Sequence, residues 1–251
     1  MSESADGSIG TGDAPLGEAP RAAEPQASRW EDFIDIFYAP SSVFARRAAS
    51  GFLLPMVVVT ILTGVFYILN SGVWSPVMDA EMSRAMAKQS QQLTAEQMQT
   101  MRGVSETMAK IGAFVFVPIG IFLTALMLWV SGKLVDAKQT LRQATMVTAF
   151  AFMPRVIEAL VVAVQGLLLD PSTFTGRWRV SLGIGRFFDP DATSPALLAF
   201  VGRLDVFTIW VTVLLAIGLA VTGRIPRGRA AIAAAIVWLL GAAPLLLQAR
   251  G

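Results

Sequence analysis

Long runs of apolar residues, separated by polar stretches, fill most of the chain after residue 50. The apolar residues come in blocks, not in the alternation of half-buried strands or the narrow stripes of surface helices. Each block reaches or approaches the ~20 residues with which a helix crosses ~30 Å of hydrocarbon. The pattern therefore predicts an all-α, polytopic membrane protein. Its five-helix transmembrane domain covers residues 49–249, with spans at about 51–73, 111–130, 144–169, 204–222 and 230–247.

Residues 28–48, before the first span, have the periodicity of an amphipathic helix. The acidic residues Glu31, Asp32 and Asp35 occupy one face, and apolar residues at helical spacing occupy the other. Ser28 and Glu31 have the spacing of a capping box. We expect an interfacial helix in the headgroup layer, and the alternative is that the same face packs on the protein's own spans. The apolar face consists of Trp30, Phe33, Ile34, Phe37 and Tyr38.

Two polar segments are predicted to lie outside the membrane. Residues 1–27 are rich in Ser, Gly, Ala, Pro and acids without apolar periodicity, which is typical of a disordered tail. Residues 78–110 are polar and helical by propensity, with Thr94 and Gln97 at the spacing of a second capping box. We expect an extramembrane helical hairpin between spans one and two, with its two helices packed back to back. Methionines at helical spacing would form the contact: Met78, Met82 and Met86, then Met98, Met101 and Met108.

A further helix is predicted just before span four. Ser194 and Pro195 are typical of the N-cap and first residue of a helix. The apolar residues that follow allow this helix to run on into the span.

Basic residues in the short loops predict the orientation. Two loops are dense in Lys and Arg, and such loops stay in the cytoplasm. The N-terminal region lies on the same side, and because five spans are an odd number, the C-terminus lies outside. The two clusters are Lys133, Lys138 and Arg142, and Arg224, Arg227 and Arg229.

Composition narrows the chemistry. Of 251 residues, 54% are hydrophobic and 15% charged, whereas soluble domains carry about a quarter charged residues. The chain has no Cys and no His, which excludes disulfides, thiol nucleophiles, Cys/His metal sites and His-based catalytic pairs. Arg residues are scattered over loops and form no nucleic-acid-binding stripe. We expect no catalytic residue, cofactor, metal or nucleic acid.

Charged residues inside the third span mark the candidate site. An Arg at mid-bilayer costs about 2.5 to 3.5 kcal/mol on insertion scales, so such groups need partners. Arg155 and Glu158 are three residues apart and can neutralise each other. Pro154 removes the amide that would bond the Phe150 carbonyl, which predicts a kink and an acceptor to be satisfied by another helix, a hydroxyl or water. Asp205, expected near the depth of Glu158, completes a hypothetical cluster.

Three stretches of sequence carry a family resemblance: "FIDIFYAPSSVFARRA", "AFMPRVIEALVVAV" and residues 204–240, where Asp205, Phe207 and Trp210 open the fourth span. Together they resemble the Yip domain family, named for Ypt/Rab-interacting proteins. The resemblance implies five membrane helices, a cytoplasmic N-terminus and no catalytic residues. Eukaryotic members are associated with vesicle trafficking and Rab-type GTPases. Sixteen Arg against four Lys make this chain more similar to the bacterial branch.

Two functions remain open. The first is a non-enzymatic scaffold or adaptor in a bacterial inner membrane, which organises lipid or protein partners. Those partners are the bilayer and an unidentified membrane or cytoplasmic protein. The second is a small transporter or channel that uses the charged third span. A water-lined path through Arg155, Glu158 and Asp205 would favour transport, whereas a dry, paired cluster would favour the scaffold.

Overall fold

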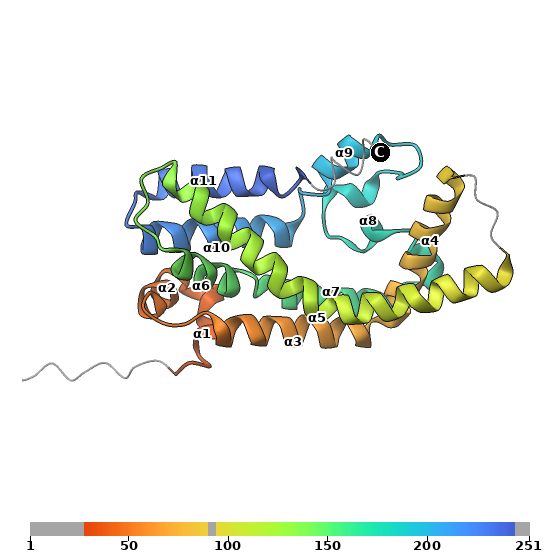
Figure 1. The fold of residues 1–251 in the computed structure, drawn as a ribbon, viewed down its shortest axis with the longest axis horizontal. Helices are drawn as coiled ribbons and strands as arrows, with labels where there is room; N and C mark the ends of the chain where they lie inside the picture. The colour runs from red at the N-terminus through yellow and green to blue at the C-terminus, as the bar shows by residue number, and fades with distance from the viewer. Residues whose placement is uncertain (1–27, 90–93, 244–251) are drawn as a thin grey trace, which may run out of the picture.

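The computed structural model describes residues 28–89 and 94–243, so the predicted disordered tail at 1–27 lies outside the described residues. The predicted all-α class is confirmed for this part of the chain, where the only strand-like pairing is an isolated bridge between Gly183 and Asp205. Figure 1 shows an elongated bundle. The helices are α1 (Asp32–Tyr38), α2 (Pro40–Arg47), α3 (Leu53–Leu69), α4 (Ser71–Gln89), α5 (Ala95–Lys133), α6 (Leu141–Ala151), α7 (Pro154–Leu168), α8 (Arg177–Val180), α9 (Pro195–Val201), α10 (Val206–Gly223) and α11 (Arg227–Leu240), with 3₁₀ turns η1 (Pro171–Thr173) and η2 (Ile184–Phe187).

Three helical units are long and apolar enough to cross a membrane: Glu96–Lys133, Leu141–Leu168 and Val206–Gly223. A bent pair, Leu53–Leu69 with Ser71–Ala87, makes a fourth if it counts as one span. The chain is therefore an integral, multi-pass membrane protein with three to four spans of this kind among the described residues. Of the predicted last span, α11 covers residues 230–240, and residues 244–247 lie outside the described part.

The first apolar segment ends earlier than predicted. The chain turns by 78° between α3 and α4, so the straight helix stops at Leu69 instead of continuing to residue 73. Asn70 ends α3, and its side-chain amide donates a hydrogen bond of 2.9 Å to the Ala159 carbonyl of α7. This bond across helices satisfies a polar group at the end of an apolar run, and it fixes the corner from which α4 departs.

The segment between spans one and two differs from the expected hairpin. Thr94 and Gln97 form both hydrogen bonds of the predicted capping box, and α5 then continues without a break into the membrane span. However, α4 packs on α3, α7 and η1. The expected back-to-back methionine contact is wrong for the second helix, where Met98, Met101 and Met108 are exposed.

The helix before the fourth span also ends early. Ser194 accepts a hydrogen bond from the Leu197 amide, and Pro195 is the first helical residue, as predicted. The helix then stops at Val201 instead of running on, and α10 starts afresh at Val206 with Asp205 as its N-cap. A capping aspartate competes with a continuous helix here, because its carboxylate binds the free amides of a new first turn.

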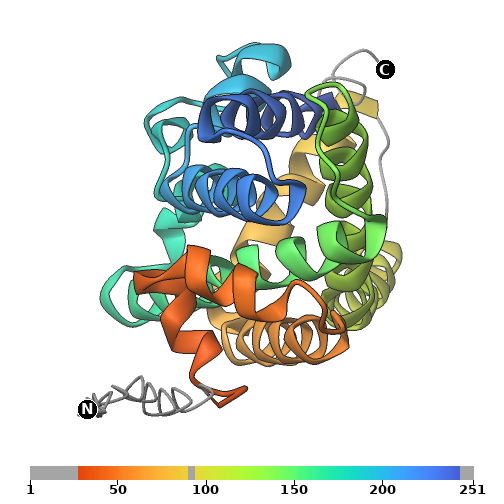
Figure 2. The same ribbon diagram turned by 90° about the vertical axis from the view of Figure 1, so that its left-hand side faces the viewer.

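The packed core lies where α2, α5, α6, α10 and α11 meet. Figure 2, which looks along the bundle, shows α10 and α11 beside each other and α3 on the opposite side. Between them, α6 is buried at every position from Ala144 to its end. A Cβ atom added to Gly218 of α10 would lie 2.3 Å from Cγ1 of Val147 on α6, so this close approach requires glycine. We call the end of the bundle that holds this packed core and α2 the α2 end, and the opposite end, which holds α4, the α4 end.

Candidate functional site: a charged pocket between the spans

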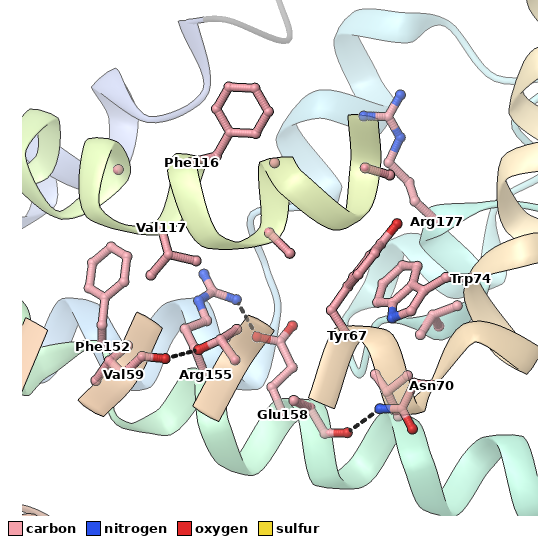
Figure 3. Close-up of a pocket in the computed structure, with 18 of the residues that line it drawn as sticks. Val59, Tyr67, Asn70, Trp74, Phe116, Val117, Phe152, Arg155, Glu158 and Arg177 are labelled. Carbon is pink, nitrogen blue, oxygen red and sulfur yellow. Dashed lines mark hydrogen bonds and ion pairs between the residues drawn. The ribbon is translucent and has the colours of Figure 1, made fainter. Parts of the chain in front are cut away.

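A cavity of about 560 Å³ opens between α3, α5 and α7 toward the α4 end (Figure 3). Its walls are mainly apolar, and a few polar side chains point into it, which is the usual make-up of a ligand pocket. Small residues on α5, including Gly112 and Ala113, leave the space open. The polar or aromatic lining consists of Tyr67, Asn70, Trp74, Arg155, Glu158 and Arg177.

The structure brings Arg155 and Glu158 together in this pocket. An Nη1 atom of Arg155 lies 2.7 Å from Oε2 of Glu158, one helical turn along α7. The other terminal nitrogen donates to the Thr208 hydroxyl of α10 at 3.0 Å. Both side chains are part-exposed, at 30% and 28%, because they face the cavity. Arg155 is therefore neutralised locally and also bonded to a second helix.

Pro154 separates α6 from α7 without a large bend. Phe152 and Met153 form a turn, and Pro154 is the first residue of α7. The Phe150 carbonyl, which loses its usual donor to the proline, accepts instead from the Met153 amide at 3.1 Å. The local backbone therefore provides a donor to this acceptor, whereas the sequence predicts a donor from another helix, a hydroxyl or water. The two helices together form one apolar unit of 28 residues.

Asp205 lies apart from the charge pair. Its side chain accepts hydrogen bonds from the Phe207 and Thr208 amides at 2.9 and 3.2 Å, and one from the Ser181 hydroxyl at 3.0 Å. Within residues 28–89 and 94–243 it forms no ion pair. The hypothetical cluster of three charges is therefore a pair plus a buried helix cap, and Thr208 touches both.

A second half-buried arginine near the site was missed by the sequence reasoning. Arg203 donates to the Trp238 carbonyl at 2.8 Å, and the Trp238 indole donates back to the Arg203 carbonyl at 3.2 Å. The guanidinium also lies 5.7 Å from the Trp238 ring centroid. Burial lowers the pKa of Arg203, and the nearby charge of Arg155 lowers it further. Nothing in the sequence around Arg203 indicates that this loop residue contacts α11.

Charged residues join α4 to the loop beside the pocket. Glu81 accepts from the Arg177 amide at 3.2 Å and pairs with the Arg177 guanidinium at 3.4 Å. Arg84 pairs with Asp191 at 3.0 Å and donates to the Thr175 carbonyl. The contacts with Glu81 hold Arg177 at the pocket wall, and those of Arg84 fasten the neighbouring loop to α4.

The N-terminal helix divides its apolar face between two environments. Phe33 is buried against Phe150 of α6, with ring centroids 5.7 Å apart, and Phe37 packs on Trp210 of α10 at 5.5 Å. The other three residues of the predicted face point away from the bundle. These are Trp30, Ile34 and Tyr38, which are 66%, 63% and 82% exposed.

On the opposite, acidic face of α1, one carboxylate is buried while Glu31 stays exposed. Asp32 is fully buried, and its two carboxylate oxygens bind Arg46, at 2.7 Å, and Arg47 of α2. Arg46 also pairs with Asp35 at 2.6 Å, and these hydrogen bonds raise the pKa of the Arg46 guanidinium. Ion pairs thus join the two short helices to each other, and aromatic contacts anchor α1 to α6 and α10 at the α2 end.

The described residues contain no group of three or more His, Cys, Asp or Glu side chains placed to hold a metal ion. The site chemistry that remains is a neutral ion pair in an apolar pocket. The ion pair can bind polar groups of a partner, and the apolar walls can bind its apolar groups.

Comparison with known proteins gives the family. No curated protein and no solved structure matches the chain. The Yip1 domain, however, matches residues 34–247, which include every helix that lines the pocket and most of α1. The chain therefore belongs to the Yip1 domain family.

Proposed function

We propose that this Yip-type membrane protein is a non-enzymatic scaffold or adaptor that organises lipid or protein partners in the membrane. The observation that carries the proposal is that the pocket, open toward the α4 end, ends against the packed core. Its lining extends to Val59, Gly120 and Phe152, and beyond them the buried residues Ile121, Met146 and Phe150 pack toward the α2 end. A cavity that ends against a packed core suits the retention of a partner's apolar group better than the passage of a solute.

The proposal includes five spans in a bacterial inner membrane. The N-terminal region and the two basic loops are cytoplasmic, and the C-terminus is outside. The density of basic residues in the loop after α5 and in the turn before α11 supports this orientation. Trp30, just before α1, then meets the cytoplasmic headgroup layer together with Ile34 and Tyr38 of α1, because amphipathic aromatic side chains are favoured there.

Filling the pocket tests the scaffold. A Cβ at Gly120 meets no atom within 4 Å, so Gly120→Leu occupies the pocket without a clash at the backbone. We expect this variant to fold. The amount of lipid or protein that co-purifies with it in native lipid should be several-fold lower than with the intact protein. Gly103→Leu is the matched control, because Gly103 also has open space around it but lies outside the pocket.

Flux measurements test the alternative. Proteoliposomes with the intact protein should show no ion or solute flux above empty liposomes, because the packed core closes the pocket at one end. Reproducible flux that disappears in Glu158→Gln would establish the transporter and reject the scaffold. Unchanged co-purification in Gly120→Leu, without flux, would reject the pocket as the partner site.

A further inference from the structure

The first half of α5 stands outside the hydrocarbon. The helix has 39 residues, or ~58 Å at 1.5 Å per residue, and ~30 Å of hydrocarbon accommodates only about 20 of them. Residues 111–130 contain no charged side chain, and Lys110 and Lys133 flank this stretch. Residues 95–110 are therefore the part that projects from the membrane.

One face of the projecting helix contacts the rest of the chain. Arg102 pairs with Asp79 of α4 at 2.9 Å, donates to the Ser75 hydroxyl at 3.0 Å and pairs with Glu106 at 3.3 Å. Ala109, one turn further on, lines the pocket. These contacts fix the direction of the helix and leave its other face without a neighbour in the described residues.

That other face carries a regular apolar stripe. Its members follow one another at spacings of three, four, three and four residues, the a and d positions of a heptad repeat. All five are substantially exposed, although the first three lie where no lipid tail can cover them. The stripe consists of Met101 (39% exposed), Val104 (55%), Met108 (58%), Ile111 (53%) and Val115 (46%).

Charge distribution is compatible with self-association through this stripe. In the same heptad frame, Glu96, Arg102, Glu106 and Lys110 occupy only b, c and f positions, on the opposite side of the helix. The flanking e and g positions carry no charge from Met98 to Phe114. In a dimer with a twofold axis, each residue of the stripe lies against the same residue of the other copy, so a charged residue there would be repelled by an identical charge. The stripe avoids that repulsion.

The membrane itself selects the geometry. Two copies inserted with the same topology project their α5 helices in the same direction and to the same height. Helices paired in this way are parallel and in register, so that a positions meet a and d positions meet d. The five exposed side chains offer roughly 450 Å² per copy, so two copies would bury on the order of 1,000 Å² with neighbouring atoms, about where specific interfaces begin.

We propose that α5 pairs with α5 of a second copy of this chain, as a parallel two-helix coiled coil through Met101, Val104, Met108, Ile111 and Val115. The pairing leaves the pocket accessible, because the pocket residues of α5 lie on another face.

Single cysteines test the pairing directly, because the chain has none of its own. Met101→Cys and Met108→Cys should form disulfide-linked dimers in oxidised native membranes. Gln99→Cys and Glu96→Cys, on the same exposed stretch but at f and c, are the matched controls. We expect at least tenfold more cross-linked dimer at the stripe positions. Equal cross-linking at stripe and control positions, or linkage only to a different protein, would overturn the proposal.

A charge exchange gives an independent test. Met101→Glu places two carboxylates against each other across the axis and should abolish recovery of an untagged copy with a tagged one. Co-expression of Met101→Glu with Met101→Lys should restore it. Met101 is exposed in one copy, so both variants should fold. Undiminished pairing of Met101→Glu with itself would reject pairing through the stripe.

Discussion

The two ends of the bundle differ in how completely their side chains are partnered. At the α2 end, Asp32 is buried with two arginines, and α6 is enclosed at every position from Ala144 to its end. At the α4 end, a pocket separates the helices, and α5 projects with an uncovered apolar stripe. The difference suggests that stability resides mainly at one end while the other is free to bind partners. Paired substitutions, each with a matched control, can test this division.

Removing a buried carboxylate should have the largest effect. Asp32→Ala deletes the group that Arg46 and Arg47 share, and breaking a buried ion pair costs several kcal/mol. Because both arginines reach solvent in part, we expect about 2 to 3 kcal/mol. Asp35→Ala makes the same chemical change at a side chain that is 36% exposed and should cost less than about 1 kcal/mol.

Thermal unfolding in detergent measures both aspartate variants. Both residues pair with Arg46, so the difference between them reports the burial of Asp32 together with its second partner, Arg47. Equal losses would mean that the junction of α1 and α2 contributes no more than a surface ion pair.

Adding one methyl group should have opposite effects on stability at the two ends of the bundle. Gly218→Ala places a Cβ 2.3 Å from Val147 in the packed core, and overpacking of this kind costs about 1 to 2 kcal/mol. Gly103→Ala adds the same methyl to the projecting part of α5, where nothing lies within 4 Å. There it should stabilise the helix by about 0.5 to 1 kcal/mol, because alanine is the better helix former. Opposite shifts in the unfolding midpoint are expected, and shifts of the same sign would contradict the comparison.

The smallest effect concerns the cap between the two ends. Asp205→Ala removes the acceptor for two α10 amides and for Ser181, so we expect a loss of about 1 kcal/mol. Asp205→Asn keeps an oxygen in the same place and should retain most of the stability. Were Asp205 an essential partner of Arg155, both variants would be equally damaging in the same unfolding measurement.

Much of the fold could be predicted because apolar block length and capping chemistry are local. The cap at Thr94 and the helix start at Pro195 follow from residues within a turn of each other, and the third span follows from one long apolar block. The corner at Asn70 could not be predicted, because its cause is a hydrogen bond to Ala159 on another helix.

The candidate site was predicted only in part for a similar reason. Arg155 and Glu158 are neighbours in sequence, so their pairing is local. Thr208, Tyr67 and Trp74 approach them only through packing of separate helices, and nothing in their own sequence surroundings distinguishes them. The face of α1 shows a further limit: periodicity identifies apolar residues but cannot tell which of them, such as Phe33 or Tyr38, meets protein and which points away.

Thr208 links the pocket mechanically to the fourth span. Its amide donates to Asp205, its hydroxyl accepts from Arg155, and its carbonyl accepts from the Thr212 hydroxyl. The first turn of α10 is thereby held at three points, one of which is a side chain of the pocket wall. A ligand that draws the Arg155 guanidinium toward itself must therefore either break its hydrogen bond to Thr208 or displace the start of α10. Thr208 thus couples binding in the pocket to the position of the fourth span.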